Sequence, residues 1–207
     1  MNKGILQARG EYLFFLNSDD AFANINVLES IFKESICSDI ITGNLIKVFP
    51  DGKSLLDKGL GFKTNGKPRL FDLVLHNFNH QSTFIKRSLF DKFGHYNEDY
   101  KIVADWLFFL QTVGIESSTV CYVDVNVALF KMGGYSYLNR DIWNKERERG
   151  IEEILPKYII DDYKYFRELA LKNSKYNYVL EYKFTYFIAR VVNKTIRIIH
   201  KVLKYNG

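Results

Sequence analysis

The chain of 207 residues has little cysteine and little proline, with two residues of the first and three of the second. Cys37 and Cys121 stand in apolar surroundings at no metal-ligand spacing, so a reducing, cytoplasmic setting is the simplest interpretation. No apolar run approaches the roughly 20 residues that a membrane-spanning helix needs, and the first residues lack the apolar segment of a signal peptide. With few prolines and no low-complexity tract, the chain is expected to fold.

Carboxylates are missing from the tail. None follows Glu181, whereas lysines and arginines continue, so the formal charge of +5 belongs mainly to the last residues. From Tyr178 onward these cations alternate with apolar residues at helical spacing, which predicts a basic amphipathic helix. Such a helix suits the anionic inner leaflet of a membrane better than nucleic acid, so no nucleic-acid partner is expected. A helix packed on the domain with its charges in water is the open alternative.

Aromatic residues are abundant at 16%, with 17 Phe and 14 Tyr, and predict an aromatic-rich core. The length suits one domain with an appendage. Periodicity and turn signals alternate strands with helices, which indicates an α/β protein. The expected strands are 12–16, 39–48, 81–85 and 120–127. The expected helices are 25–35, 71–76, 87–93, 102–113, 143–158 and 161–172.

The stretch 12–20 combines a short aromatic-rich strand with two adjacent carboxylates, Asp19 and Asp20. A continuous apolar run is typical of a strand buried on both faces of a parallel sheet, and ligands bind at the carboxyl ends of such strands. Two neighbouring carboxylates repel one another unless a cation lies between them. The alternative is that Asp20 caps the helix expected at 25–35.

Several short motifs follow one another in an order that resembles the inverting family 2 glycosyltransferases, which have the GT-A fold. The resemblance extends from residue 1 to about residue 136. It rests on these segments: Met1-Asn2-Lys3-Gly4, Ala8-Arg9-Gly10-Glu11-Tyr12, Leu16-Asn17-Ser18-Asp19-Asp20, His80-Gln81, Gly94-x-Tyr96-x-Glu98, Ala104-Asp105-Trp106 and Gly133-Gly134-Tyr135-Ser136.

This resemblance implies a GT-A-like αβα sandwich of the kind that transfers sugars from nucleotide diphosphates. Residues 1–140 would form the distal part of that domain, and 141–207 a helical, basic C-terminal extension. The implied activity is hexosyl transfer, with inversion, from a nucleotide-sugar donor such as a UDP-sugar to a hydroxyl of a glycan or lipid-linked acceptor. Cell-surface polysaccharide biosynthesis, in the cytoplasm or peripherally on the inner membrane, would be its setting.

The resemblance also assigns roles at the donor side. Asp20 would be the direct ligand of Mg²⁺ or Mn²⁺, which neutralises the diphosphate of the donor. Asp19 would contact the ribose or the water shell of the metal. Gln81 and Lys131 are further candidate donor contacts, although Gln81 could instead satisfy a strand edge.

At the acceptor side the resemblance makes Asp105 the catalytic base, with His80 and Trp106 beside it. A carboxylate within hydrogen-bond reach can take the proton of the attacking hydroxyl. Without the resemblance, Asp105 is a first-turn aspartate favoured by the helix dipole. His80 could then be an ordinary buried histidine with one backbone partner.

Relatives of this kind have an additional N-terminal segment that contacts the nucleotide base, and this sequence is expected to lack it. The strand at 12–16 would then expose a hydrophobic edge, and donor binding would be weakened. A non-catalytic fragment that binds a membrane surface or another protein is therefore the alternative function.

Overall fold

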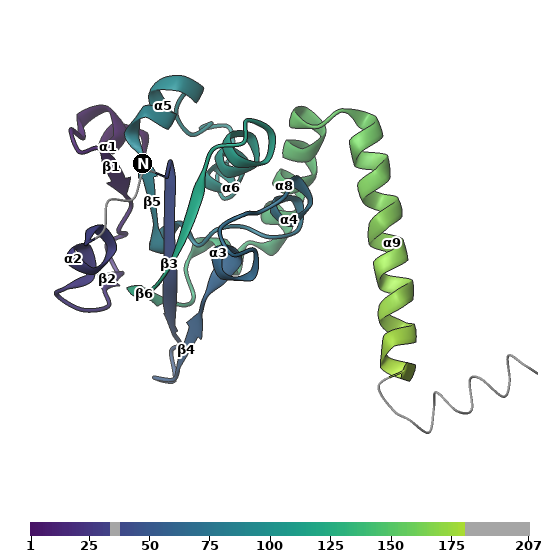
Figure 1. Cartoon of the computed structure of the whole chain (residues 1–207), viewed down its shortest axis with the longest axis horizontal. Helices are drawn as coiled ribbons and strands as arrows, with labels where there is room; N and C mark the ends of the chain where they lie inside the picture. The colour runs from purple at the N-terminus through teal and green to yellow at the C-terminus, as the bar shows by residue number, and fades with distance from the viewer. Residues whose placement is uncertain (34–37, 181–207) are drawn as a thin grey trace, which may run out of the picture. The chain divides into compact units, whose positions relative to one another are not determined.

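The computed structural model describes residues 1–33 and 38–180 of the chain (Figure 1). The chain divides into two compact units, Met1–Ile154 and Leu155–Gly207. In the second unit the structure describes the helix α9 (Lys157–Leu180). The predicted basic tail lies outside the described residues from 181 onward, and the domain boundary predicted at residue 140 stays a prediction. Within the described part, no helix is both long enough and apolar enough to cross a bilayer.

A six-stranded mixed sheet forms the centre of the first unit, as Figure 1 shows. The strands are β1 (Tyr12–Phe14), β2 (Ala21–Phe22), β3 (Ile40–Val48), β4 (Ser54–Asp57), β5 (Thr83–Lys86) and β6 (Val120–Lys131). They follow the order β1-β5-β3-β6-β2, and β4 pairs with β3. Among these strands, β3 and β6 run parallel and the other pairs are antiparallel. The predicted α/β class is confirmed.

Short helices connect the strands of the first unit. They are α1 (Asn2–Gln7), α2 (Val27–Phe32), α3 (Gly59–Lys63), α4 (Leu70–Leu75), α5 (Arg87–Phe93), α6 (Ala104–Phe109), α7 (Tyr135–Leu138) and α8 (Arg140–Ile154). A 3₁₀ turn, η1 (His80–Ser82), precedes β5, and a π-helical segment, η2 (Leu110–Ile115), continues α6. Gly94 ends α5 with φ of +85°, as its position predicted.

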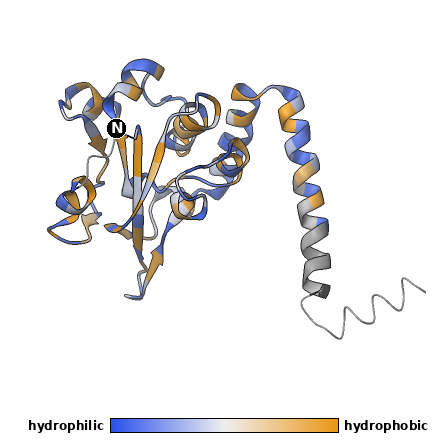
Figure 2. Cartoon of the chain, in the orientation of Figure 1, coloured by the Kyte–Doolittle hydropathy of each residue, from blue (hydrophilic) through white to orange (hydrophobic). Residues whose placement is uncertain are grey.

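The alternation of side chains along β3 gives the sheet two packed faces. Ile41 and Leu45 are buried against Val27 and Ile31 of α2, whereas Thr42 points the other way, toward Gly61 of α3. Apolar residues accordingly line β3 and β6 at the centre of Figure 2. Helices therefore cover the sheet on both sides (Figure 1).

Aromatic rings join the first residues of the chain to the helices that follow β5. Phe90 of α5 stacks on Phe108 of α6 with ring centroids 4.6 Å apart. Tyr96 lies 5.5 Å from Phe15, and Phe15 lies 6.3 Å from Phe90. The predicted aromatic-rich core is confirmed, and it attaches β1 to the body of the domain.

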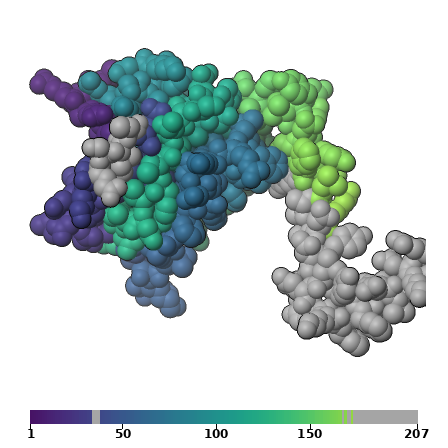
Figure 3. Space-filling view, viewed as in Figure 1, coloured from purple at the N-terminus to yellow at the C-terminus, as the bar shows by residue number. Residues whose placement is uncertain are grey.

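The strand predicted at 12–16 differs from the expectation in length and in surroundings. It ends at Phe14, pairs antiparallel with β5, and buries Leu13 while leaving Tyr12 and Phe14 half-buried. An apolar run cannot distinguish an antiparallel edge strand from a parallel central one, and this caused the error. Among the described residues, β5 is its sheet partner and the other edge is open. A groove of about 550 Å³ follows that edge beside α1, which lies at the margin of the molecule (Figure 3).

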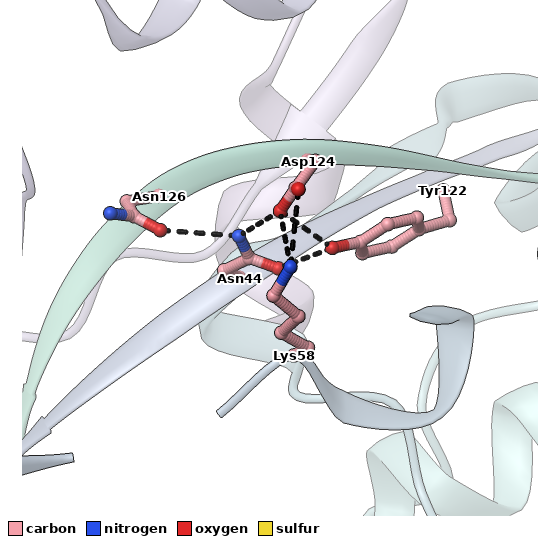
Figure 4. Close-up of polar contacts among 5 residues, drawn as sticks. All are labelled: Asn44, Lys58, Tyr122, Asp124 and Asn126. Atoms are coloured by element: carbon pink, nitrogen blue, oxygen red, sulfur yellow. Dashed lines mark hydrogen bonds and ion pairs between the residues drawn. The ribbon is translucent and has the colours of Figure 1, made fainter. Parts of the chain in front are cut away.

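A polar network holds β3, β6 and the start of α3 together (Figure 4). The buried amide of Asn44 donates to Asp124 at 2.8 Å and to Asn126 at 3.1 Å, and it accepts from the Tyr122 hydroxyl at 2.7 Å. Lys58 contacts both Asp124 oxygens at 3.1 Å. Hydrogen bonds from Asn44, Lys58 and Tyr122 lower the pKa of Asp124 to about 2. Burial and this carboxylate raise the pKa of Tyr122 to about 12. The network is satisfied internally, which indicates a structural role.

This network surrounds a bulge, because the register of β3 against β6 shifts on either side of Asn44. Gly43 precedes that shift, and a Cβ there would lie 2.6 Å from Val127 Cγ2 and 2.7 Å from the Val125 carbonyl oxygen. The interruption that Gly43-Asn44 predicted in this strand is thus confirmed. The close approach of β6 explains why glycine is required.

We predict that Gly43→Ala lowers the free energy of unfolding by about 1–3 kcal/mol, because β6 must move to admit the methyl group. Gly4→Ala is the matched control. A Cβ at Gly4 meets no atom within 4 Å, and alanine favours the helix α1. Urea unfolding of both variants measures the difference. Equal stabilities of the two variants would contradict the argument.

Candidate active site

His80 and Asp105 form a buried pair between the sheet and α6. His80 lies in η1, just before β5, and Asp105 lies in the first turn of α6. His80 Nδ1 is 2.8 Å from Asp105 Oδ2, and the side chains are 20% and 10% exposed. The amide of Asn77 donates to the same oxygen at 3.2 Å. The histidine therefore has a carboxylate as its partner, and Asp105 is more than a dipole-favoured first-turn residue.

The two pKa values of this pair move in opposite directions. Burial raises the pKa of Asp105, but the hydrogen bond and positive charge of His80 outweigh it, so the value lies below the ordinary 3.8. Burial lowers the pKa of His80, but Asp105, and at longer range Asp20, raise it above the ordinary 6.5. The pair is consequently ionised at pH values between these two.

Asp20 is the second buried carboxylate of the site. Its side chain is 9% exposed, and Asn17 donates to Oδ2 at 3.1 Å. Oδ1 is buried without a hydrogen-bond partner in the described part of the chain. Burial, together with the neighbouring charge of Asp19, raises the pKa of Asp20 above its ordinary value. The alternative prediction that Asp20 caps the next helix is wrong, because Asn26 occupies the N-cap of α2.

The two buried carboxylates are linked through His80. The negative charge of Asp20 raises the pKa of His80, and the positive charge of His80 lowers the pKa of Asp20. Residues that are 60 or more positions apart in the sequence thus act on one another electrostatically.

A cleft of about 300 Å³ opens at His80 and Asp105. Polar groups from the loop before β5, including Asn77 and Gln81, form part of its wall. Aromatic and apolar side chains from α6, β6, α7 and α8 form the rest. Asp20 is not part of the lining. The cleft therefore opens at His80 and Asp105 and not at Asp20.

The remaining predicted site residues are placed as follows. Gln81 lines the cleft, but it lies in η1 and not in the strand that was expected to begin there. Trp106 lines the cleft too, although it is almost fully buried and its ring N–H donates to the Leu73 carbonyl at 2.8 Å. Asp19 is exposed, and Lys131 is exposed at the end of β6, where its backbone contacts the Asp20 carboxylate. The roles assigned to these residues stay predictions.

Glu146 is a functional candidate that the sequence did not reveal. Its buried carboxylate, on α8, accepts from the backbone N–H groups of Lys101, Ile102 and Val103 at 2.8, 2.9 and 3.2 Å. These residues lead directly into α6, so Glu146 fixes the segment before the helix that carries Asp105. Its partners are at least 43 positions away along the chain, so no local pattern could have identified it. The same holds for Asn77, which lies in an irregular loop.

The described residues contain no group of three or more histidine, cysteine or acidic side chains that could hold a metal ion. A metal at this site would therefore depend on Asp20 together with oxygen atoms from a ligand or water. The unpartnered Oδ1 of Asp20 fits such a cation, because carboxylate oxygens are preferred ligands of Mg²⁺.

We predict that Asp105→Asn lowers the pKa of His80 below its wild-type value, because burial remains while the main negative charge is lost. NMR titration of the His80 ring measures this shift. The ring signal that is absent from the spectrum of His80→Gln is assigned to His80. Asp19→Asn is the control, because Asp19 does not contribute to the His80 pKa. An unchanged His80 pKa in Asp105→Asn would contradict the pairing.

The stability of the fold should follow the same titration. A raised pKa in the folded state means that His80 contributes stability that is fully present below the unfolded value of 6.5. That contribution is lost as the pH rises through the folded value. The advantage of wild type over Asp105→Asn in urea midpoint should therefore be greatest at mildly acidic pH and be lost at alkaline pH.

Comparison with known proteins gives sequence relatives that cover about two thirds of the chain. PGL/p-HBAD biosynthesis glycosyltransferases of Mycobacterium bovis and Mycobacterium tuberculosis are 30% identical over 141 residues, which is 66% of this chain and 51% of theirs. The chain thus spans about half the length of these curated relatives. No family model matches. A crystal structure of residues 1–349 of TarS from S. aureus aligns with a TM-score of 0.45 at 18% identity, covering 63% of this chain and 38% of that one. Over the matched segment the chain is homologous to glycosyltransferases, which confirms the resemblance seen in its motifs.

Proposed function

We propose that this chain catalyses glycosyl transfer, with inversion, from a nucleotide-sugar donor to a hydroxyl group. The observation that carries the proposal is an ionised carboxylate, Asp105, buried at a cleft of roughly the size of one sugar ring and its substituents. The homology to glycosyltransferases supports the reaction class. A GT-A-like fold and a UDP-sugar donor are part of the proposal.

Asp105 acts as the general base. The acceptor oxygen bonds to the anomeric carbon while the bond from that carbon to the donor phosphate breaks, and the hydroxyl proton passes to Asp105. The nucleoside diphosphate leaves with the electron pair of the broken bond. Both side-chain contacts of Asp105 are on Oδ2, so Oδ1 is the oxygen that neither His80 nor Asn77 occupies, and it takes the proton.

His80 keeps the base charged. A carboxylate as buried as Asp105 would become protonated without a partner, and the His80 cation prevents this. The consequence is a weaker base, since a lowered pKa reduces the driving force for proton transfer. His80 thus makes the base available at neutral pH at the expense of its strength.

Asp20 is the proposed ligand of Mg²⁺ or Mn²⁺, on the basis of its unpartnered Oδ1. Such an ion, when bound, neutralises the negative charge that develops on the departing diphosphate. Asn17 holds the other oxygen of Asp20 and so orients the carboxylate. Asp19, exposed beside it, is available to the ribose or to the metal's water shell, and Gln81 and Lys131 are proposed donor contacts.

The relatives are named for PGL/p-HBAD biosynthesis. We propose a glycan or a lipid-linked molecule as the acceptor here, consistent with a role in cell-surface glycoconjugates.

The test is hydrolysis of UDP-sugars by the full chain, since water can replace an unidentified acceptor. Wild type should release UDP in the presence of Mg²⁺ or Mn²⁺ and lose this activity with EDTA. Asp105→Asn should lower the rate by about 10²–10⁴-fold, the usual contribution of a general base. Asp20→Asn should raise the metal concentration required for half-maximal rate.

Asp99→Asn is the matched control, because Asp99 is an exposed carboxylate in the loop before α6. It should retain wild-type activity. No metal-dependent turnover of any UDP-sugar by the wild-type chain, or equal rates for Asp105→Asn and Asp99→Asn, would contradict the proposed function.

A further inference from the structure

A stack of alternating aromatic rings and guanidinium groups leads from the catalytic pair along the wall of the cleft. Arg147 lies 4.0 Å from the ring centre of Trp106 and 4.7 Å from that of Trp143. Arg140 lies 4.8 Å from the Trp143 ring. The stack starts next to Asp105, at Trp106, and ends at Arg140 in the first turn of α8, where the side chain is exposed.

The ring of Trp143 contacts two guanidinium groups of its own helix. Arg140 precedes Trp143 by about one helical turn and Arg147 follows it by about one turn, and both guanidinium groups lie within 5 Å of the ring centre. The wall formed by α8 therefore presents the Arg140 guanidinium to the cleft, held in place by its contact with Trp143.

The charges that line the cleft are compensated except at this point. Lys47 is paired with Asp57 at 2.6 Å, and Asp105 is paired with His80. Within the described residues, Arg140 has no salt-bridge partner. The lining thus has an excess positive charge, at the far end of the stack from Asp105.

From this charge and this placement we infer that Arg140 binds a phosphate group of the acceptor, while Asp105 takes the proton of the acceptor hydroxyl. The inference rests on the proposed function and names its acceptor class, a sugar that carries a phosphate ester. A guanidinium group binds phosphate through two parallel hydrogen bonds, which would fix the orientation of the sugar as well as its affinity. Arg140 is then a specificity-determining residue.

The donor diphosphate is the competing anion, and the structure separates the two. Asp20, the proposed metal ligand, does not line the cleft that contains Arg140. Donor binding should therefore depend on Asp20 and acceptor binding on Arg140, each independently of the other.

Tryptophan fluorescence provides a binding measurement that needs no turnover. The chain has two tryptophans, of which Trp106 is buried and Trp143 is partly exposed in the cleft wall. The full chain is titrated with α-D-glucose 1-phosphate, methyl α-D-glucoside and inorganic phosphate. Binding of UDP in the presence of Mn²⁺ is measured separately by isothermal titration calorimetry, because Asp20 does not line the cleft that contains the tryptophans. Trp143→Phe identifies the reporter.

Glucose 1-phosphate should change the fluorescence of wild type with an affinity about tenfold or more above that of the methyl glucoside and of phosphate alone. Arg140→Gln should lose this tenfold preference, Arg140→Lys should retain part of it, and Asp20→Asn should retain all of it. Binding of UDP with Mn²⁺ should show the reverse dependence, surviving Arg140→Gln and failing in Asp20→Asn.

Lys145→Gln is the matched control, since Lys145 is an exposed cation of α8 outside the cleft lining. Far-ultraviolet circular dichroism and urea midpoints establish that the variants are folded. The inference is overturned if Arg140→Gln binds glucose 1-phosphate as wild type does, if phosphate alone binds as tightly as the sugar phosphate, or if Asp20→Asn abolishes the binding. If the wild-type chain releases no UDP from UDP-sugars while the titrations give the expected results, only the proposed function is contradicted.

Discussion

The hydrogen-bonded pair of His80 and Asp105 is the interaction on which the site depends. At 2.8 Å it couples the end of an irregular loop to the first turn of α6, and it keeps a buried carboxylate charged. Neither charge would be tolerated alone at this depth. Two further residues support the position of the pair. Asn77 donates to the same carboxylate oxygen, and Glu146 accepts hydrogen bonds from the segment that leads into α6.

The pair also connects the two halves of the proposed reaction. Asp20 lies near enough to His80 for each charge to alter the titration of the other. Neutralising Asp20 with a cation would remove one influence that raises the His80 pKa. Binding of metal and donor would in this way reduce the protonation of His80 slightly and strengthen Asp105 as a base. The coupling is electrostatic and requires no movement of the backbone.

Several parts of the fold and of the candidate site could be predicted from the sequence, because each depends on a few neighbouring residues. The adjacent Asp19 and Asp20 after an aromatic run, the aspartate at the head of an apolar helix, and the interruption at Gly43-Asn44 are each visible within a few residues. The pairing of His80 with Asp105 spans 25 residues, and the hydrogen bonds from the segment before α6 to Glu146 span more than 40. Such contacts depend on how helices pack across the sheet, which periodicity does not encode.

The wrong predictions also concern features that depend on contacts between distant parts of the chain or on hydrogen bonds that periodicity does not encode. The apolar run at 12–16 predicted a fully buried strand, yet β1 is a three-residue strand that pairs antiparallel with β5. Gln81 was expected in a strand and lies in a 3₁₀ turn, because hydrogen bonds from Ser82 and Thr83 to the Asn79 carbonyl tighten the chain there. Arg140 and Trp143 could not be identified as site residues from the sequence, because a charged surface helix carries no local signal of a binding site. Their positions in the cleft identify them.

The central claim is that Asp20, His80 and Asp105 form one site with a divalent cation at Asp20. Paramagnetic broadening by Mn²⁺ tests it most directly, because the effect falls steeply with distance from the ion. With Mn²⁺ and UDP added to the full chain, the ring signals of His80 should broaden at substoichiometric metal, and this broadening should disappear in Asp20→Asn. If the His80 signals stay sharp in wild type while Mn²⁺ binds, or broaden equally in Asp20→Asn, the cation lies elsewhere and the account is wrong.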